Sequence, residues 1–135
     1  GGMMDHIRMM ALSFAHYGVV NMEEGRELVI YCTQEYLSAI NACEEIRDNL
    51  IHYPFTPQDI EIAIFIRGPK NEEVSIGELN VVCIINGIVK YKIEQPGFPS
   101  MKKIHEETYE EAVKIIQEKD PTMQLIKKKQ KGGKA

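Results

Sequence analysis

The sequence contains no tryptophan, only 7% aromatic residues and three cysteines among its 135 residues. None of the cysteines forms a Cys-x-x-Cys pair, so the spacing of a zinc ribbon or a dithiol redox site is missing. The glycine-rich loops of nucleotide-binding proteins and the Gly-x-Ser-x-Gly turn of serine hydrolases are also missing. These absences argue against the enzyme classes that carry such signatures, and we expect neither a metal site nor a cofactor.

The chain also lacks a long hydrophobic run, since its apolar stretches are far shorter than the roughly 20 residues that cross a membrane. We therefore expect a soluble domain with no membrane span. The opening Gly1-Gly2-Met3-Met4 fits either the remnant of a tag or the start of a trimmed chain. The localisation stays open between the cytoplasm and export after removal of a leader.

Charge is distributed unevenly along a chain that is 44% hydrophobic, enough for one globular core. Five lysines within residues 127–135 follow a body with 11 basic and 20 acidic residues, a net charge of −9. Because nucleic-acid binding depends mainly on phosphate neutralisation, the acidic body argues against that partner. We interpret residues 1–126 as a single α+β domain and residues 127–135 as a basic flexible tail. Nucleic-acid binding through the tail is a weaker alternative.

Three consecutive segments predict an antiparallel sheet. Residues 60–66 alternate strictly, with isoleucine at every second position. The apolar runs 79–85 and 88–93 are joined by Asn86-Gly87, and this pair favours the two-residue turn of a β-hairpin. Residues 7–17 fit either a strand or a helix, and we favour a strand that joins the sheet.

Two helical patterns surround these strands. The first begins at Asn21, with Glu24 completing a capping box, and its apolar stripe continues to about Leu50, with Arg26 and Asn41 on the polar side. The second is capped by Ser100 and ends before Pro121. The predicted fold is α+β in the order β-α-β-β-β-α, an antiparallel sheet of three to four strands with two helices packed on one face. Residues 122–126 are a possible further strand.

The hairpin has two apolar faces, although a sheet buried on one side only carries polar residues on the other. If the turn has two residues, the register of the hairpin places five apolar residues on its second face, which are Leu79, Val81, Cys83, Ile85 and Ile88. We expect this face to be covered by the N-terminal segment, by a ligand or by a second subunit. It is our candidate interface of a homodimer.

Aromatic and histidine side chains mark the candidate ligand sites. His52, Tyr53 and Phe55 surround two prolines in one loop, and His105 and Tyr109 lie one helical turn apart in the second helix pattern. If the fold brings the five together, they would line a small-molecule or enzyme pocket. Otherwise the loop aromatics close the core, and His105 belongs to a solvated, acidic helix start. The lack of a catalytic signature favours binding over catalysis.

Residues 49–57, followed by Asp59-Ile60-Glu61-Ile62, and the segment 105–112 resemble a family of small uncharacterised bacterial proteins. The resemblance extends over about residues 5–119. It implies a helix before the Tyr-Pro-Phe-Thr segment and strands after it, and some similar proteins carry an export leader. No activity is established for the group, so it implies no site residues. We therefore predict a small binding or interaction module whose partner is a second copy, another protein or a small molecule.

Overall fold

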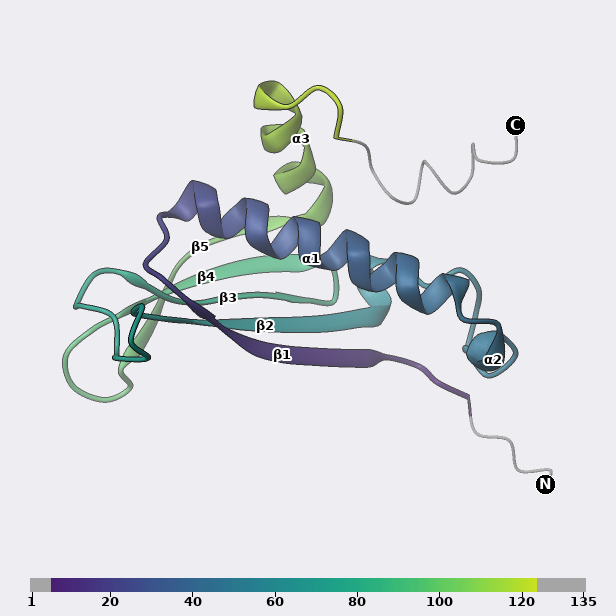
Figure 1. Ribbon diagram of the computed structural model, residues 1–135, viewed down its shortest axis with the longest axis horizontal. Coiled ribbons are helices and arrows are strands. Elements are labelled where there is room, and N and C mark those ends of the chain that lie inside the picture. The colour runs from purple at the N-terminus through teal and green to yellow at the C-terminus, as the bar shows by residue number, and fades with distance from the viewer. Residues whose placement is uncertain (1–5, 124–135) are drawn as a thin grey trace.

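A mixed five-stranded sheet carries two long helices on one face in the computed structural model, which describes residues 6–123 (Figure 1). The strand order is β1-β2-β3-β4-β5, with β1 parallel to β2 and all other neighbours antiparallel. The strands are β1 (Met10–Tyr17), β2 (Ile60–Arg67), β3 (Leu79–Ile85), β4 (Ile88–Glu94) and β5 (Met101–Thr108). The helices are α1 (Met22–Ala42), the short α2 (Glu44–Arg47), the 3-10 turn η1 (Pro57–Asp59) and α3 (Tyr109–Lys119).

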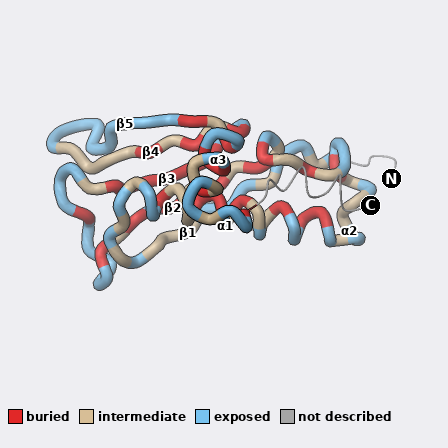
Figure 2. The backbone as a smooth tube through the Cα atoms, turned by 90° about the horizontal axis from the view of Figure 1, so that it is seen from above, coloured by how far each residue is buried: buried red, intermediate tan, exposed pale blue. Residues whose placement is uncertain are grey.

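Helix α1 forms the connection between β1 and β2 and lies across the middle of the sheet (Figure 1). It begins as the sequence predicts, because the Asn21 side chain accepts a bond from the Glu24 backbone N–H and the Glu24 carboxylate accepts one from Asn21. Its buried residues face β2 and β3, and α3 covers the β4 side of the same face. Figure 2 shows the buried residues concentrated between the helices and the inner strands, while β5 is largely exposed.

The core side of the sheet follows the predicted alternation. The four even-numbered isoleucines of β2, from Ile60 to Ile66, are at most 2% exposed. The hairpin register pairs Ile84 with Val89 and Val82 with Tyr91, as a two-residue turn requires. Asn86 and Gly87 both have positive φ, 54° and 78°, which is the conformation that Asn-Gly adopts readily. The predicted strands, the strand in residues 7–17 and the placement of both long helices on one face are confirmed.

Two expectations about the sheet are corrected. It has five strands instead of three to four, and it is mixed because β1 runs parallel to β2. A crossover helix of 21 residues between two adjacent strands returns the chain to the same end of the sheet, which makes the pair parallel. The first helix pattern also ends earlier than predicted, at Ala42, and the separate α2 follows it.

The segment that we predicted as the start of the second helix is strand β5 up to Thr108. His105 therefore pairs with Tyr91 of β4 and is not one helical turn from Tyr109. The helix starts at Tyr109, with Thr108 as its N-cap and Glu111 completing the capping box. An edge strand rich in charged residues carries no apolar alternation, so only its pairing with β4 identifies it.

A β-bulge moves Leu79 away from the face that we assigned to it. The register shifts between Leu79 and Val81, where Asn80 donates a hydrogen bond to the Glu94 carboxylate (2.8 Å). Leu79 packs in the core on the helix side, whereas Val81 keeps the opposite orientation. The predicted interface set therefore loses one member.

The end of the chain is only partly described. Thr122 lies in a turn and Met123 is buried outside any strand, while residues 124–126 of the predicted strand, together with the lysine-rich tail, lie outside the described residues. Within residues 6–123, none of the helices is long and apolar enough to cross a membrane.

Packing of α1 on the sheet depends on Gly25. A Cβ atom at this position would lie 3.1 Å from both Leu79 Cδ1 and Val82 Cγ2. We expect Gly25→Leu to lower the free energy of unfolding by about 2 kcal/mol in urea denaturation, because the added side chain overpacks this contact. Ala39→Leu, at an exposed site of the same helix, is the matched control and should change it by about 0.5 kcal/mol or less. Equal effects of the two variants would contradict this packing.

Candidate functional site

Predicted site residues occupy three separate places, and the first is the loop after α2. Phe55 is 1% exposed and closes this end of the core. Its backbone is held by one side chain, because the Asn41 amide accepts from Phe55 N (2.8 Å) and donates to Phe55 O (3.1 Å). Asn41 is buried and not on the polar side of α1, which corrects our assignment. Phe55 therefore has a structural position and is not open to a ligand.

Tyr53 projects from the same loop and is half exposed. Its ring lies beneath the guanidinium of Arg47, with Cζ 4.7 Å from the ring centroid. Both side chains donate to the carbonyl of Asn41, Tyr53 through its hydroxyl (3.3 Å) and Arg47 through Nη2 (3.1 Å). A hollow of about 470 Å³ opens beside this stack, lined by Ser38, Asn41, Ala42, Arg47, Tyr53 and Pro54.

His52 does not line that hollow. Its Nε2 lies 3.0 Å from the carboxylate of Asp59, and its ring is tilted against Phe55. The Asp59 carboxylate also accepts from the backbone and hydroxyl of Thr56, so it holds the start of η1. This arrangement orders the loop and leaves His52 engaged on its surface.

The second place is a buried carboxylate between α1, β4 and β5. Glu107 is 6% exposed and accepts two bonds from Arg26, at 2.8 Å from Nε and 3.1 Å from Nη2. The hydroxyl of the buried Tyr91 donates to the same carboxylate, and Nε2 of His105 lies 3.1 Å from it. Arg26 also lies over the Tyr91 ring. One arginine from α1 thus joins two adjacent strands.

The electrostatics of this cluster favour an ionised Glu107. Burial by itself raises the pKa of the carboxyl group, but the bonds from Arg26, Tyr91 and His105 outweigh it and hold the pKa below its usual value. Burial and the bond to Glu107 raise the pKa of Tyr91 far above its usual range, so the phenol stays protonated. The Glu107 bond also raises the pKa of Arg26. The cluster is a satisfied ion pair, and its geometry suits structural support.

The fold does not bring the two groups of predicted ligand residues together. His105 contacts the cluster around Arg26, whereas Tyr53 contacts Asn41, and these two α1 positions are about 22 Å apart along the helix. Tyr109 is buried under α1, where its hydroxyl accepts from Gln34 (3.1 Å). The convergence required for one shared pocket is therefore absent from the described part of the chain.

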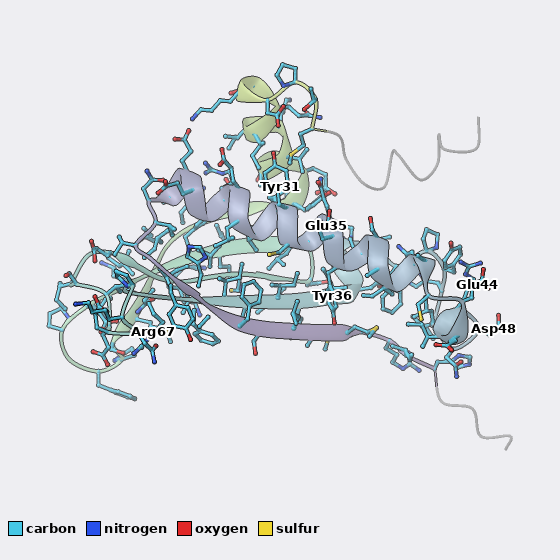
Figure 3. All side chains as sticks on the ribbon, viewed as in Figure 1. Tyr31, Glu35, Tyr36, Glu44, Asp48 and Arg67 are labelled. Carbon is cyan, nitrogen blue, oxygen red and sulfur yellow. The ribbon has the colours of Figure 1, made fainter. Side chains whose placement is uncertain are left out.

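The third place is the face of the sheet opposite the helices, which we call the outer face. It contains Ala63 and Phe65 of β2, Val81, Cys83 and Ile85 of β3, and Ile88, Lys90 and Lys92 of β4. No described helix covers it (Figure 3), yet Val81 and Cys83 are only 5% and 4% exposed. Burial raises the pKa of the Cys83 thiol.

The exposed apolar side chains of the outer face differ from the predicted set. Phe65 is 43% exposed and Ile85 39%, whereas Val81 and Cys83 are almost fully buried. Two shallow hollows, of about 250 and 230 Å³, lie on this face. Phe65, Val81 and Met101 line the first, and Ala63 and Ile85 contribute to the second.

Sequence reasoning missed Arg26, Arg47 and Phe65. Arg26 and Arg47 sit among acidic residues in polar helical stretches, and nothing local shows that one is paired with Glu107 while the other stacks on Tyr53. Phe65 occupies the opposite strand face from the four isoleucines, and its apolar character at a polar position was the available signal. Among residues 6–123, no group of three or more potential metal ligands is placed to hold an ion.

Comparison of the chain with models of known protein families, with curated proteins and with solved structures found no match in any of the three. The resemblance to small bacterial proteins therefore stays a prediction.

Removing the buried charge tests the role of the Glu107 cluster. We expect Glu107→Gln to lower the free energy of unfolding at pH 7 by about 3 kcal/mol, because Arg26 stays buried without its counter-charge. Because the pKa of Glu107 is lowered in the folded state, the ionised carboxylate stabilises the fold at pH values above the pKa that Glu107 has in the unfolded chain. This stabilisation is lost as the pH falls below 4.5. The difference between wild type and variant should therefore narrow in acid.

Lys103→Met is the matched control, because it breaks the exposed Lys103–Glu106 pair on the same strand. It should cost about 0.5 kcal/mol or less. Urea denaturation at pH 7 and pH 3.5 measures both variants. A Glu107→Gln effect that is small, or that is the same at both pH values, would show that the ion pair does not support the fold.

Proposed function

We propose that the protein is an interaction module that associates with a second copy of itself through the outer face of its sheet. The observation that carries this proposal is the uncovered position of Phe65 and Ile85 on a face where Val81 and Cys83 are already withdrawn from solvent. Apolar patches of this kind on a sheet mark contact surfaces in soluble proteins. Two such faces packed about 10 Å apart form a β-sandwich.

The charges of the outer face support a second copy as the partner. Glu61 lies on β2 and Lys90 and Lys92 lie on β4, on opposite sides of β3. A two-fold axis parallel to β3 places β2 of one copy against β4 of the other. Glu61 of each copy then lies on the side of Lys90 of the other, and Cys83 lies near the axis. Identical copies placed this way attract each other along both flanks of an apolar centre.

The shape of the outer face also fits this arrangement. Small side chains of Ala11, Ser13 and Ala63 form part of the lining of one hollow, while Phe65, two residues further along β2, is exposed. A face with both a recess and a projection can pack against a copy of itself. The Tyr53 loop contacts the C-terminal end of α1, which lies on the opposite side of the sheet from the outer face. Binding of a ligand near Tyr53 is therefore separate from self-association.

Replacing the central aromatic residue tests the interface. We expect the wild-type chain to sediment as a dimer at micromolar concentration, and Phe65→Asp to raise the dissociation constant at least 100-fold by burying a charge in the apolar centre. Phe98→Asp is the control, because Phe98 is fully exposed in the loop between β4 and β5. Sedimentation equilibrium, with circular dichroism to check the fold, measures both. A monomeric wild type at 100-fold higher concentration would refute the proposal.

A charge exchange tests the two-fold arrangement. Glu61→Lys and Lys90→Glu should each weaken the dimer about tenfold, because each places like charges together across the interface. The double variant should recover most of the lost affinity. If the losses of dimer affinity of the two single variants simply add in the double variant, these two residues do not meet across the interface, and this axis is ruled out.

A further inference from the structure

The hollow beside Arg47 and Tyr53 has the features of a ligand site that the proposed dimer does not use. We infer that it binds a small organic carboxylate, with the guanidinium of Arg47 as the group that recognises the anion. This inference is independent of the proposed self-association, because the hollow is formed by the end of α1, by α2 and by the following loop.

The first argument is an unsatisfied donor. The Nε atom of Arg47 is buried and has no hydrogen-bond partner in residues 6–123. A buried donor without a partner costs about 1–3 kcal/mol, so a ligand that accepts from it regains that free energy. Arg26 provides the contrast within the same chain, because its Nε and Nη2 both bond to Glu107. In Arg47, Nη2 donates to the Asn41 carbonyl, and Nε is left without an acceptor among the described residues.

The second argument is that Arg47 is held in place. Its guanidinium lies 4.7 Å from the centroid of the Tyr53 ring, and Nη2 donates to the Asn41 carbonyl at 3.1 Å. Asn41 is in turn fixed by its two bonds to the backbone of Phe55. A guanidinium that is already oriented loses little conformational entropy when it binds an anion. In the described part of the chain, no acidic side chain lies within ion-pair distance of it.

The third argument concerns which anion fits. The hollow of about 470 Å³ is far larger than a bare carboxylate, and Ala42 and Pro54 give it an apolar part, while the Ser38 hydroxyl is a further polar group on its wall. Glu44 and Asp48, labelled near α2 in Figure 3, are exposed neighbours of Arg47 in sequence that do not line the hollow. Their charges disfavour a dianionic phosphate more than a singly charged carboxylate. The ligand class is therefore a monocarboxylate with an apolar group.

Side-chain NMR tests this directly on the full chain, because the Arg Nε–Hε signal reports on the donor itself. We expect sodium benzoate to shift the Arg47 Nε–Hε signal in a saturable manner, with a dissociation constant on the order of 1 mM. Sodium chloride at equal ionic strength should cause no saturable shift, and inorganic phosphate should bind at least five times more weakly. The Arg26 signal should not move, since Glu107 already occupies its donors.

Variants separate this site from its surroundings. Arg47→Lys should weaken benzoate binding at least tenfold, as followed by the backbone amide signals of Ser38 and Tyr53, because an ammonium neither stacks nor presents the Nε donor. Arg67→Lys, at the opposite end of the sheet, is the control and should bind benzoate as wild type does (Figure 3).

Three results would overturn the inference. They are an equal response to chloride, an unchanged affinity in Arg47→Lys, and a shift of the Arg67 signal as large as that of Arg47. Because benzoate binding is read on Arg47 and self-association by sedimentation, failure of this site leaves the proposed dimer untouched, and failure of the dimer leaves this site untouched.

Discussion

The docking of α1 on one face of the sheet is the interaction on which the rest of the structure depends. Close contact at Gly25 lets the helix approach Leu79 and Val82, and the buried stripe that follows fixes its rotation. That rotation points Arg26 at Glu107 and, about four turns later, Asn41 at Phe55. The ion pair at one end and the loop clamp at the other are both consequences of a single packing arrangement.

The same packing of helices on one side determines which face of the sheet stays uncovered. Two long helices cover one face of a five-stranded sheet, and no described helix covers the outer face (Figure 3). The inner face is closed by isoleucine, valine and tyrosine side chains that are almost fully buried. The outer face combines apolar residues at its centre with charges at its flanks, and this composition is typical of a surface that meets another protein.

The two arginines of the helical region show how similar residues acquire different roles. Arg26 faces a carboxylate on β5, so its charge is compensated inside the protein. Arg47 faces an aromatic ring and a carbonyl, which orient the guanidinium without neutralising it. Both donate through Nη2, but only the first has a partner for Nε among the described residues. The difference between structural support and ligand recognition thus depends on what lies opposite each side chain.

Local patterns in the sequence were sufficient for much of the fold. The alternation of β2, the Asn86-Gly87 turn and the capping box at Asn21 depend on neighbouring residues, and each produced the element that it predicts. The face shared by Val81, Cys83 and Ile85 also followed from the hairpin register. These features depend on interactions within a few residues or across a two-residue turn, which the sequence by itself determines.

Features that depend on distant partners were decided by the tertiary structure. Strand β5 exists because β4 offers it a free edge, and Leu79 turns toward the core because Asn80 forms a bulge held by Glu94. His105 and Tyr53 are separated because α1 is rigid and about 30 Å long. The sequence alone determined the local geometry and one side of the sheet. Only the assembled fold decided which polar side chains found partners, because pairing of buried charges depends on contacts between residues far apart in the chain.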